Sequence, residues 1–152
     1  MGAVFFYHLT KGPLEATLPV LLTKARAVGW RVAVRGVDPA RMEWLDQKLW
    51  TGPEEGFLAH GLAGGEQDAD QPILLTCKAG AANDPACVMS IDGADVLPEE
   101  VTALERVCIL FDGNDPDAVQ QARTQWKSLT DAGCPAQYWS EESGRWEKKA
   151  EK

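Results

Sequence analysis

The residues best suited to chemistry lie on one face of a predicted helix near the C-terminus. Arg123, Trp126 and Lys127 stand three and four positions apart, and residues at this spacing are neighbours on a helix surface. An indole ring flanked by an arginine and a lysine can hold an aromatic side chain and a carboxylate together. These groups bind a ligand but do not break a covalent bond, so they favour binding over catalysis. A second interpretation stays open, in which Trp126 is buried and the two cations form an ordinary solvated face.

Groups that enzymes use for acid–base or metal chemistry are scarce. The chain has two histidines, His8 and His60, and neither is accompanied by a recognisable nucleophile. We expect His60 to order a loop through hydrogen bonds. The four cysteines form no C-x-x-C pair, so neither a zinc site nor a redox dithiol is predicted, and structural roles in a reducing compartment are expected for Cys77, Cys87, Cys108 and Cys134. No metal ligand set and no cofactor are predicted.

The polar segment 51–71 is the alternative place for a ligand, because it contains the glycine-rich run 61–65. A phosphate-binding loop must open a helix and present free N–H groups to the anion. Here Glu66, Asp68 and Asp70 follow the glycines and would repel a phosphate. A flexible loop is therefore favoured. A small α/β nucleotide- or cofactor-binding enzyme with its site near this loop is kept as the competing hypothesis.

Two aromatic residues, Trp50 and Phe57, lie on either side of a proline- and glycine-containing stretch. Aromatic side chains in this position are often lids on a hydrophobic core. They are also enriched as anchors of protein–protein interfaces. The spacing alone leaves both interpretations open.

The length and charge of the chain restrict its partners. With 152 residues and 45% hydrophobic residues, it can form one well-buried core. The net charge of −8 is uneven, since residues 37–122 carry seventeen acidic and four basic side chains. This balance argues against direct DNA binding through a broad basic surface. The more basic segments 1–36 and 123–152 could meet as a positive patch for an acidic peptide.

Hydrophobic periodicity predicts alternating strands and helices. Strands are expected at about 4–7, 30–34, 72–76, 87–91 and 107–111, with an edge strand at 136–139; helices are expected at 13–28, from Pro39 to about 50 and from Pro116 to Gly133, with a short helical turn after Pro98. This order predicts one α/β domain over 1–146, with a mostly parallel sheet flanked by helices. Residues 147–152 are expected to form a charged, frayed tail. No membrane span or export signal is recognised, so a cytoplasmic protein is expected.

Three stretches together resemble the chi subunit of bacterial DNA polymerase III, an accessory protein of the clamp loader. The first is Phe6-Tyr7-His8-Leu9 in the opening strand. The second is Leu45-Asp46-Gln47-Lys48-Leu49-Trp50, followed by Phe57 and by His60-Gly61-Leu62. The third runs from Arg123-Thr124-Gln125-Trp126-Lys127 to Gly133 and ends in the region of Trp146. The order and spacing of these stretches match over nearly the whole chain.

The resemblance implies a Rossmann-like three-layer sandwich without a nucleotide site, and a non-catalytic adaptor. Its implied partner is the acidic C-terminal tail of single-stranded-DNA-binding protein, which the chi subunit links to the clamp loader. By residue matching, Arg123, Trp126 and Lys127 fall on the helix that binds the tail. Leu110 and Phe111 would line the apolar part of that pocket. A second surface for the clamp-loader psi subunit, or for a helicase, would include Trp50, Phe57 and His60.

Some positions depart from the family pattern. A lysine that family members can show one turn before the arginine is Val119 here, and an arginine that can follow the aromatic–basic pair is Thr130. The cationic cluster is therefore thinner, which predicts weaker tail binding. At the second surface, Ala59 replaces the proline that usually precedes the histidine.

Overall fold

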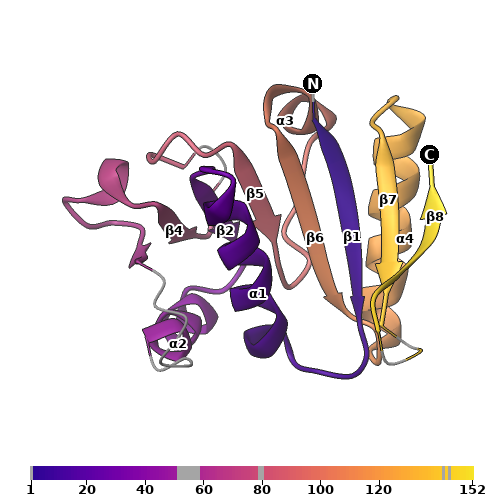
Figure 1. Cartoon of the computed structure of the whole chain (residues 1–152), viewed down its shortest axis with the longest axis horizontal. Helices are drawn as coiled ribbons and strands as arrows, with labels where there is room; N and C mark the ends of the chain where they lie inside the picture. Colours follow the sequence, from indigo (N-terminus) through magenta and orange to yellow (C-terminus); the bar gives the residue numbers. More distant parts are fainter. Residues whose placement is uncertain (1, 51–58, 79–80, 142, 144) are drawn as a thin grey trace.

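The computed structural model describes residues 2–50, 59–78, 81–141, 143 and 145–152, which form one mixed α/β unit (Figure 1). Its strands are β1 (Ala3–Leu9), β2 (Val32–Arg35), β3 (Gly61–Leu62), β4 (Ile73–Thr76), β5 (Cys87–Ser90), β6 (Arg106–Asp112), β7 (Ala136–Ser140) and β8 (Glu147–Glu151). Its helices are α1 (Leu14–Ala27), α2 (Pro39–Trp50), α3 (Pro98–Ala103) and α4 (Pro116–Asp131), and a 3-10 turn, η1, covers Asp68–Asp70.

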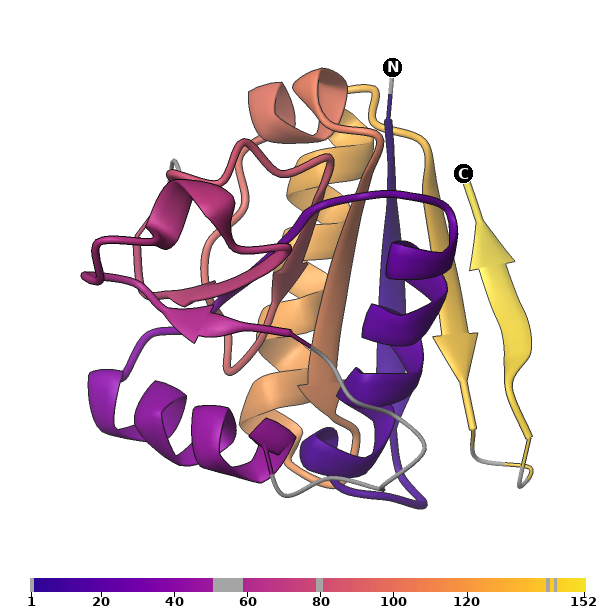
Figure 2. The same cartoon turned by 60° about the vertical axis from the view of Figure 1, so that its left-hand side comes forward.

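The sheet has the strand order β3-β4-β2-β5-β6-β1-β7-β8. Neighbouring strands are parallel except for the antiparallel pair β7 and β8. Helices α1 and α2 cover one face of the sheet, and α3 and α4 cover the other (Figures 1 and 2). The predicted Rossmann-like three-layer arrangement is confirmed.

Local sequence signals fix where two of the helices begin. The Asp115 carboxylate accepts a hydrogen bond from the Asp117 N–H at 3.0 Å, directly before Pro116. Asp38 accepts from the Ala40 N–H at 3.1 Å before Pro39 in the same way. An aspartate cap followed by a proline satisfies a free N–H group and presets the helical φ angle. Gly133 follows α4 with φ +90°, a conformation that favours glycine.

Two hydrophobic clusters lie on opposite faces of the sheet because successive strand residues point to opposite sides. On β6, Cys108 and Leu110 belong to the cluster under α1 and α2. Val107, Ile109 and Phe111 belong to the cluster under α3 and α4. Three cysteines, Cys87, Cys108 and Cys134, are buried, whereas Cys77 is exposed.

The C-terminal segment differs from the expected frayed tail. Residues 147–151 form β8, which pairs with β7 through Gln137 opposite Glu151 and Ser140 opposite Glu147. Strand β7 is therefore an inner strand and not the predicted edge strand. Main-chain pairing does not depend on hydrophobic side chains, and charged residues are typical of exposed edge strands. Composition alone therefore gave the wrong expectation here.

A carboxylate near this end of the sheet is bound by three backbone N–H groups. Thr10, Lys11 and Gly12 donate to Glu141 Oε1 at 3.0, 2.9 and 3.2 Å. We expect Glu141→Ala to lower the free energy of unfolding by about 1–3 kcal/mol, because the partly buried donors at Thr10 and Gly12 lose their acceptor. Urea denaturation of the two proteins measures the change. Equal unfolding midpoints and slopes would contradict this role.

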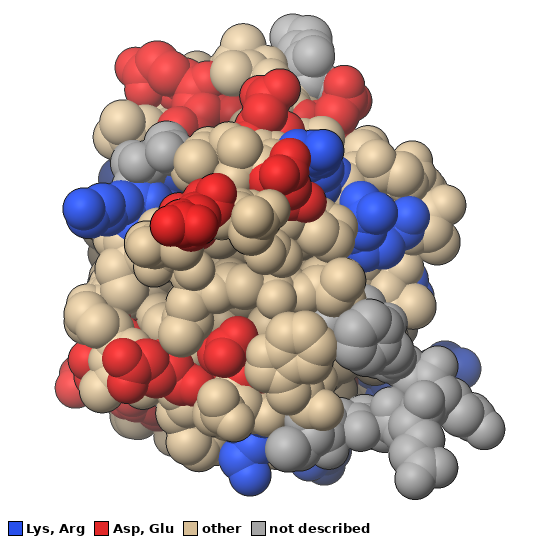
Figure 3. Space-filling model, turned by 90° about the vertical axis from the view of Figure 1, so that its left-hand side faces the viewer, with Lys and Arg blue, Asp and Glu red and all other residues tan. Residues whose placement is uncertain are grey.

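Acidic and basic side chains are both present on one side of the molecule, in separate places. The side that carries α2, β3 and β4 shows acidic groups at its upper end and lower left, with separate basic groups between them and to the right (Figure 3). The basic segments 1–36 and 123–152 do not merge into one patch at their helices, because α1 and α4 lie on opposite faces of the sheet (Figure 2). Among the described residues, no helix has the length and apolarity that a membrane crossing requires.

Candidate functional site

Helix α4 presents the predicted cationic face to solvent. Arg123 and Lys127 are exposed, whereas Trp126 is half-buried between them and the sheet. No carboxylate among the described residues pairs with Arg123. Lys127 Nζ lies 3.3 Å from Asp131 Oδ2, in a solvent-exposed pair one helical turn apart. Such pairs contribute little energy, about 0–1 kcal/mol, so both cations are open to an anionic partner.

Trp126 is the outermost ring of an aromatic cluster beneath this face. Its ring centroid lies 5.3 Å from that of Phe6 and 6.0 Å from that of Tyr138, both in edge-to-face contact. Phe111 lies 5.9 Å from Tyr138. The Tyr138 hydroxyl is 2.7 Å from His8 Nδ1, which fixes the ring on β7. The cluster supports one side of Trp126 and leaves the other side at the surface.

The structure brings Phe111 to this cluster but not Leu110. Leu110 is 1% exposed and packs in the cluster under α1 and α2, on the opposite face of the sheet. Leu110 therefore does not support Trp126, because consecutive strand residues alternate between faces. Both residues do contribute to the lining of one crevice, at the carboxyl ends of β1 and β6. Tyr138, which the sequence analysis missed, occupies the place beside Trp126. Its position two residues after the buried Ala136 in a predicted strand was the available signal.

The predicted second surface is present in part. Trp50 ends α2 with 48% of its surface exposed, and its ring centroid lies 4.2 Å from that of His60. His60 is buried, and its Nε2 atom lies 3.1 Å from Asp46 Oδ1 and 3.0 Å from the Asp46 carbonyl oxygen. His60 therefore orders this end of α2, in line with the predicted hydrogen-bonding role. Phe57 lies outside the described residues.

A further tryptophan on α2 was not identified from the sequence. The Trp44 ring lies 4.6 Å from the Arg41 guanidinium carbon and 5.5 Å from Lys48 Nζ. The i−3 and i+4 spacing of these cations around Trp44 was visible in the sequence and has the same physical basis as the spacing on α4. Helix α2 thus carries two exposed indole rings, Trp44 and Trp50.

Several polar groups beside the place where nucleotide-binding α/β folds hold a phosphate have partners within the chain. A crevice of about 650 Å³ lies at the carboxyl ends of β1 and β6, between the starts of α1 and α4. The Glu141 carboxylate accepts hydrogen bonds from the N–H groups of residues 10–12, which precede α1. Gln121 donates to the Gly93 carbonyl at 2.9 Å, and Arg41 pairs with Asp92 at 3.1 Å. These polar groups are engaged internally.

The glycine-rich stretch of the alternative hypothesis is likewise engaged. Gly64 and Gly65 donate their N–H groups to the two carboxylate oxygens of Asp68, at 2.9 and 3.0 Å. Residues 61–71 also contain β3 and η1, so the described part is more ordered than the flexible loop that was expected. Within the described ranges, no group of three or more histidine, cysteine or carboxylate residues is arranged to hold a metal ion.

Comparisons with known proteins identify the family. Residues 1–137 match the family model described as DNA polymerase III chi subunit, HolC. The chain is 28% identical over 142 residues to the DNA polymerase III subunit chi of Pseudomonas aeruginosa, covering 90% of this chain and 95% of the relative. It is 23% identical over 111 residues to the probable DNA polymerase III subunit chi of Rickettsia prowazekii, covering 70% and 67%. The match extends from β1 through α4 to the start of β7, and the chain therefore belongs to the DNA polymerase III chi subunit family of DNA replication accessory subunits.

Proposed function

We propose that this chain binds the acidic C-terminal tail of single-stranded-DNA-binding protein and links that protein to the clamp loader, without catalysing a reaction. The observation that carries the proposal is the α4 surface formed by Arg123, Trp126 and Lys127, which we call the tail surface. It joins a guanidinium without an internal carboxylate partner, among the described residues, to a half-buried indole ring.

Each group has a distinct role in the proposed complex. Arg123 pairs with the terminal carboxylate of a tail that ends in phenylalanine, and Lys127 attracts aspartates upstream of it. Trp126 contacts the phenylalanine ring, with Tyr138 and Phe111 supporting it from below. Burying a phenylalanine contributes about 1.5–3 kcal/mol, and a hydrogen bond to a charged group contributes about 1.5–3 kcal/mol. The cost of ordering the peptide is subtracted from these contributions. We therefore expect micromolar affinity, a binding free energy of about −8 kcal/mol or weaker.

The replaced family positions lie on the same helix. Val119 is half-buried against the hydrophobic cluster under α3 and α4 and carries no charge. The Thr130 hydroxyl donates to the Trp126 carbonyl at 2.8 Å, so its side chain is directed to its own helix. With two of the family's cations absent, Arg123 supplies a larger share of the electrostatic attraction. This attraction weakens as salt rises, because exposed charges are screened.

Replacing Arg123 with alanine tests the proposal. We expect the affinity for a tail peptide ending in phenylalanine to fall roughly tenfold or more, since a charge-assisted hydrogen bond to the carboxylate is lost. Isothermal titration calorimetry of the purified protein with the peptide measures the change. Lys24→Ala, which removes a cation from α1 on the opposite face, is the matched control. Unchanged affinity in Arg123→Ala would refute the proposal.

We further propose that Trp50, Phe57 and His60 belong to a second partner surface, for the clamp-loader psi subunit or a helicase. The exposed Trp50 ring held against the buried His60 supports this, because exposed, rigid aromatic rings are common interface anchors. Pull-down with a Trp50→Ala variant, compared with Arg123→Ala, tests it. Loss of the same partners in both variants would contradict two separate surfaces.

A thermal-shift screen against nucleotides addresses the competing enzyme hypothesis. A nucleotide that specifically stabilises the protein would support that hypothesis.

A further inference from the structure

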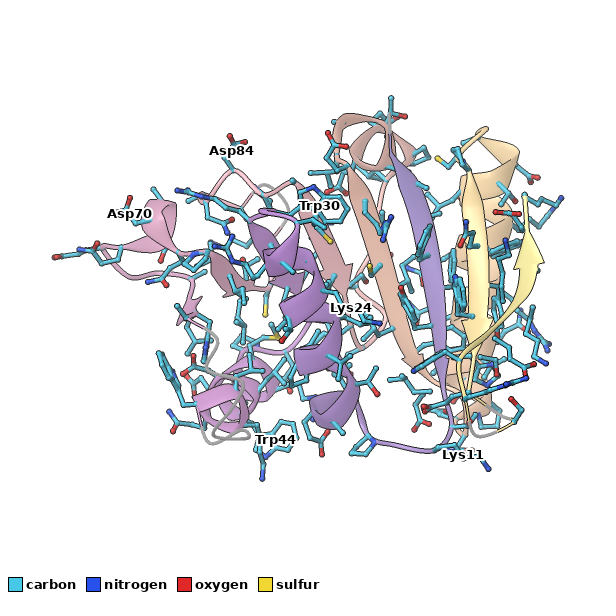
Figure 4. The ribbon with its side chains drawn as sticks, viewed as in Figure 1. Lys11, Lys24, Trp30, Trp44, Asp70 and Asp84 are labelled. Atoms are coloured by element: carbon cyan, nitrogen blue, oxygen red, sulfur yellow. The ribbon has the colours of Figure 1, made fainter. Side chains whose placement is uncertain are left out.

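A cavity with two cationic side chains in its lining lies on the other face of the sheet from the tail surface. It has a volume of about 340 Å³ and runs between the C-terminal half of α1 and strands β5, β6 and β1. Lys24 and Trp30 lie along it, on the side of α1 that is turned toward β6 (Figure 4). Its walls also include Arg106, the first residue of β6, and Tyr7 of β1. We call this cavity the α1 groove.

Arg106 is held in a fixed position at one wall of the α1 groove. Its guanidinium carbon lies 4.1 Å from the centre of the Phe5 ring and 5.2 Å from that of the Trp30 ring. Its Nε atom is buried and has no hydrogen-bond acceptor among the described residues. No carboxylate in the described part of the chain forms an ion pair with Arg106 or Lys24. The groove therefore presents two cations that no carboxylate of the described residues neutralises.

The rest of the lining contributes no negative charge. None of the described residues that line the α1 groove is an aspartate or a glutamate, although the chain has a net charge of −8. Burial, and then the neighbouring Cys108 thiol, raise the pKa of Tyr7 far above its ordinary value, so the phenol stays neutral. A cavity with two cations and no anion in an acidic protein attracts negatively charged ligands.

The apolar part of the α1 groove favours a peptide over a nucleic acid as its ligand. Single-stranded nucleic acids stack their bases on open aromatic faces. Here one face of Phe5 and one of Trp30 are covered by Arg106, and the edge-to-face contact of Tyr7 with Trp146 occupies a third ring. The apolar lining left open is largely aliphatic, with Leu21 half-buried and Val28 65% exposed. These surfaces suit an aliphatic side chain.

We propose that the α1 groove binds an internal acidic peptide segment of a partner protein. A carboxylate of the segment pairs with Arg106 and Lys24, and a neighbouring leucine-like side chain packs against Leu21 and Val28. Because Arg106 is already ordered by two aromatic rings, pairing costs little side-chain entropy. The site is separate from the tail surface, since α1 and α4 cover opposite faces of the sheet. One accessory subunit can then hold two acidic segments at once.

The test uses a blocked peptide that lacks a free C-terminal carboxylate. The probe is acetyl-Asp-Glu-Leu-Asp-Glu-amide, and the control peptide is its neutral analogue acetyl-Asn-Gln-Leu-Asn-Gln-amide. Titration into the ¹⁵N-labelled full chain is followed by the indole N–H signals of the six tryptophans. We expect the Trp30 signal to shift with the acidic peptide, at roughly tenfold lower peptide concentration than with the neutral one.

A pair of charge reversals separates the two surfaces. Lys24→Glu should weaken binding of the acidic peptide roughly tenfold or more while leaving calorimetric binding of the phenylalanine-ending tail unchanged. Arg123→Glu should do the reverse. Shifts at Trp126 in place of Trp30, equal binding of the neutral peptide, or binding that survives Lys24→Glu would overturn the proposal. A Trp30 response to oligothymidylate but not to the acidic peptide would also overturn it and favour a nucleic acid.

Discussion

Replacing Glu100 with alanine is expected to lower the free energy of unfolding by about 3–5 kcal/mol, because Arg35 is then buried without its partner. Arg35 is 6% exposed, and its two terminal nitrogens contact the two Glu100 oxygens, one pair at 3.0 Å. The same guanidinium donates to the Asp95 carbonyl at 3.0 Å. Glu100 also accepts from the Leu97 N–H at 3.1 Å at the start of α3. Urea denaturation measures the loss.

The adjacent Glu99 provides the matched control. It lies in the same first turn of α3, is exposed, and forms no ion pair with the described residues. Glu99→Ala should therefore change the free energy of unfolding by less than about 0.5 kcal/mol. Similar losses in both variants would show that the pairing with Arg35 is not the source of the stability.

The same pair predicts how stability responds to acid. The hydrogen bond from Arg35 is the largest cause that lowers the pKa of Glu100 below its ordinary value of 4.5. A carboxylate with a lowered folded pKa binds its proton more readily in the unfolded chain. Its stabilisation is therefore fully present above about pH 4.5 and is lost as pH falls through the folded pKa. Glu100→Ala should lose less stability on acidification, which urea midpoints at pH 7 and below pH 4.5 would reveal.

Most of the fold follows from local signals in the sequence. The aspartate–proline pairs at 38–39 and 115–116 predicted where α2 and α4 begin, since the cap and the fixed φ angle act within a few residues. Strand β8 was not predicted, because its sequence, two lysines and one alanine between two glutamates, has no hydrophobic period. It forms by pairing with the main chain of β7, and this pairing is visible only in the folded sheet.

The candidate site also combines features that local sequence predicts with features that depend on the folded sheet. The spacing of Arg123, Trp126 and Lys127 depends on helix geometry alone, so their common face was readable from the sequence. Strand alternation already places Leu110 and Phe111 on opposite faces of the sheet, so only Phe111 could be expected in the aromatic cluster beside Trp126. Tyr138 and Trp126 meet because α4 and β7 pack against the same hydrophobic cluster. The strand order was not predictable from any single segment, and neither was the α1 groove, to which α1 and three parallel strands contribute.

Replacing Phe6 with alanine is expected to have a large effect on stability and a separate effect on tail binding. Phe6 is fully buried in β1, with its ring 5.3 Å from that of Trp126 and stacked at 6.5 Å on that of Tyr138. Removing a buried phenylalanine ring costs about 3–5 kcal/mol of unfolding free energy. Because Trp126 loses the ring that supports it, the affinity for the phenylalanine-ending tail peptide should fall several-fold. Calorimetry at a temperature where circular dichroism shows the variant folded measures this.

Leu18→Ala separates the two effects. Leu18 is also fully buried, but it lies on α1 in the cluster on the opposite face of the sheet. The substitution should lower the free energy of unfolding by a comparable amount, about 2–5 kcal/mol. The affinity for the tail peptide should equal that of the wild-type protein. If both variants lose tail affinity equally, binding depends on overall stability and not on the ring that positions Trp126. If neither loses affinity, the aromatic cluster does not support the tail surface.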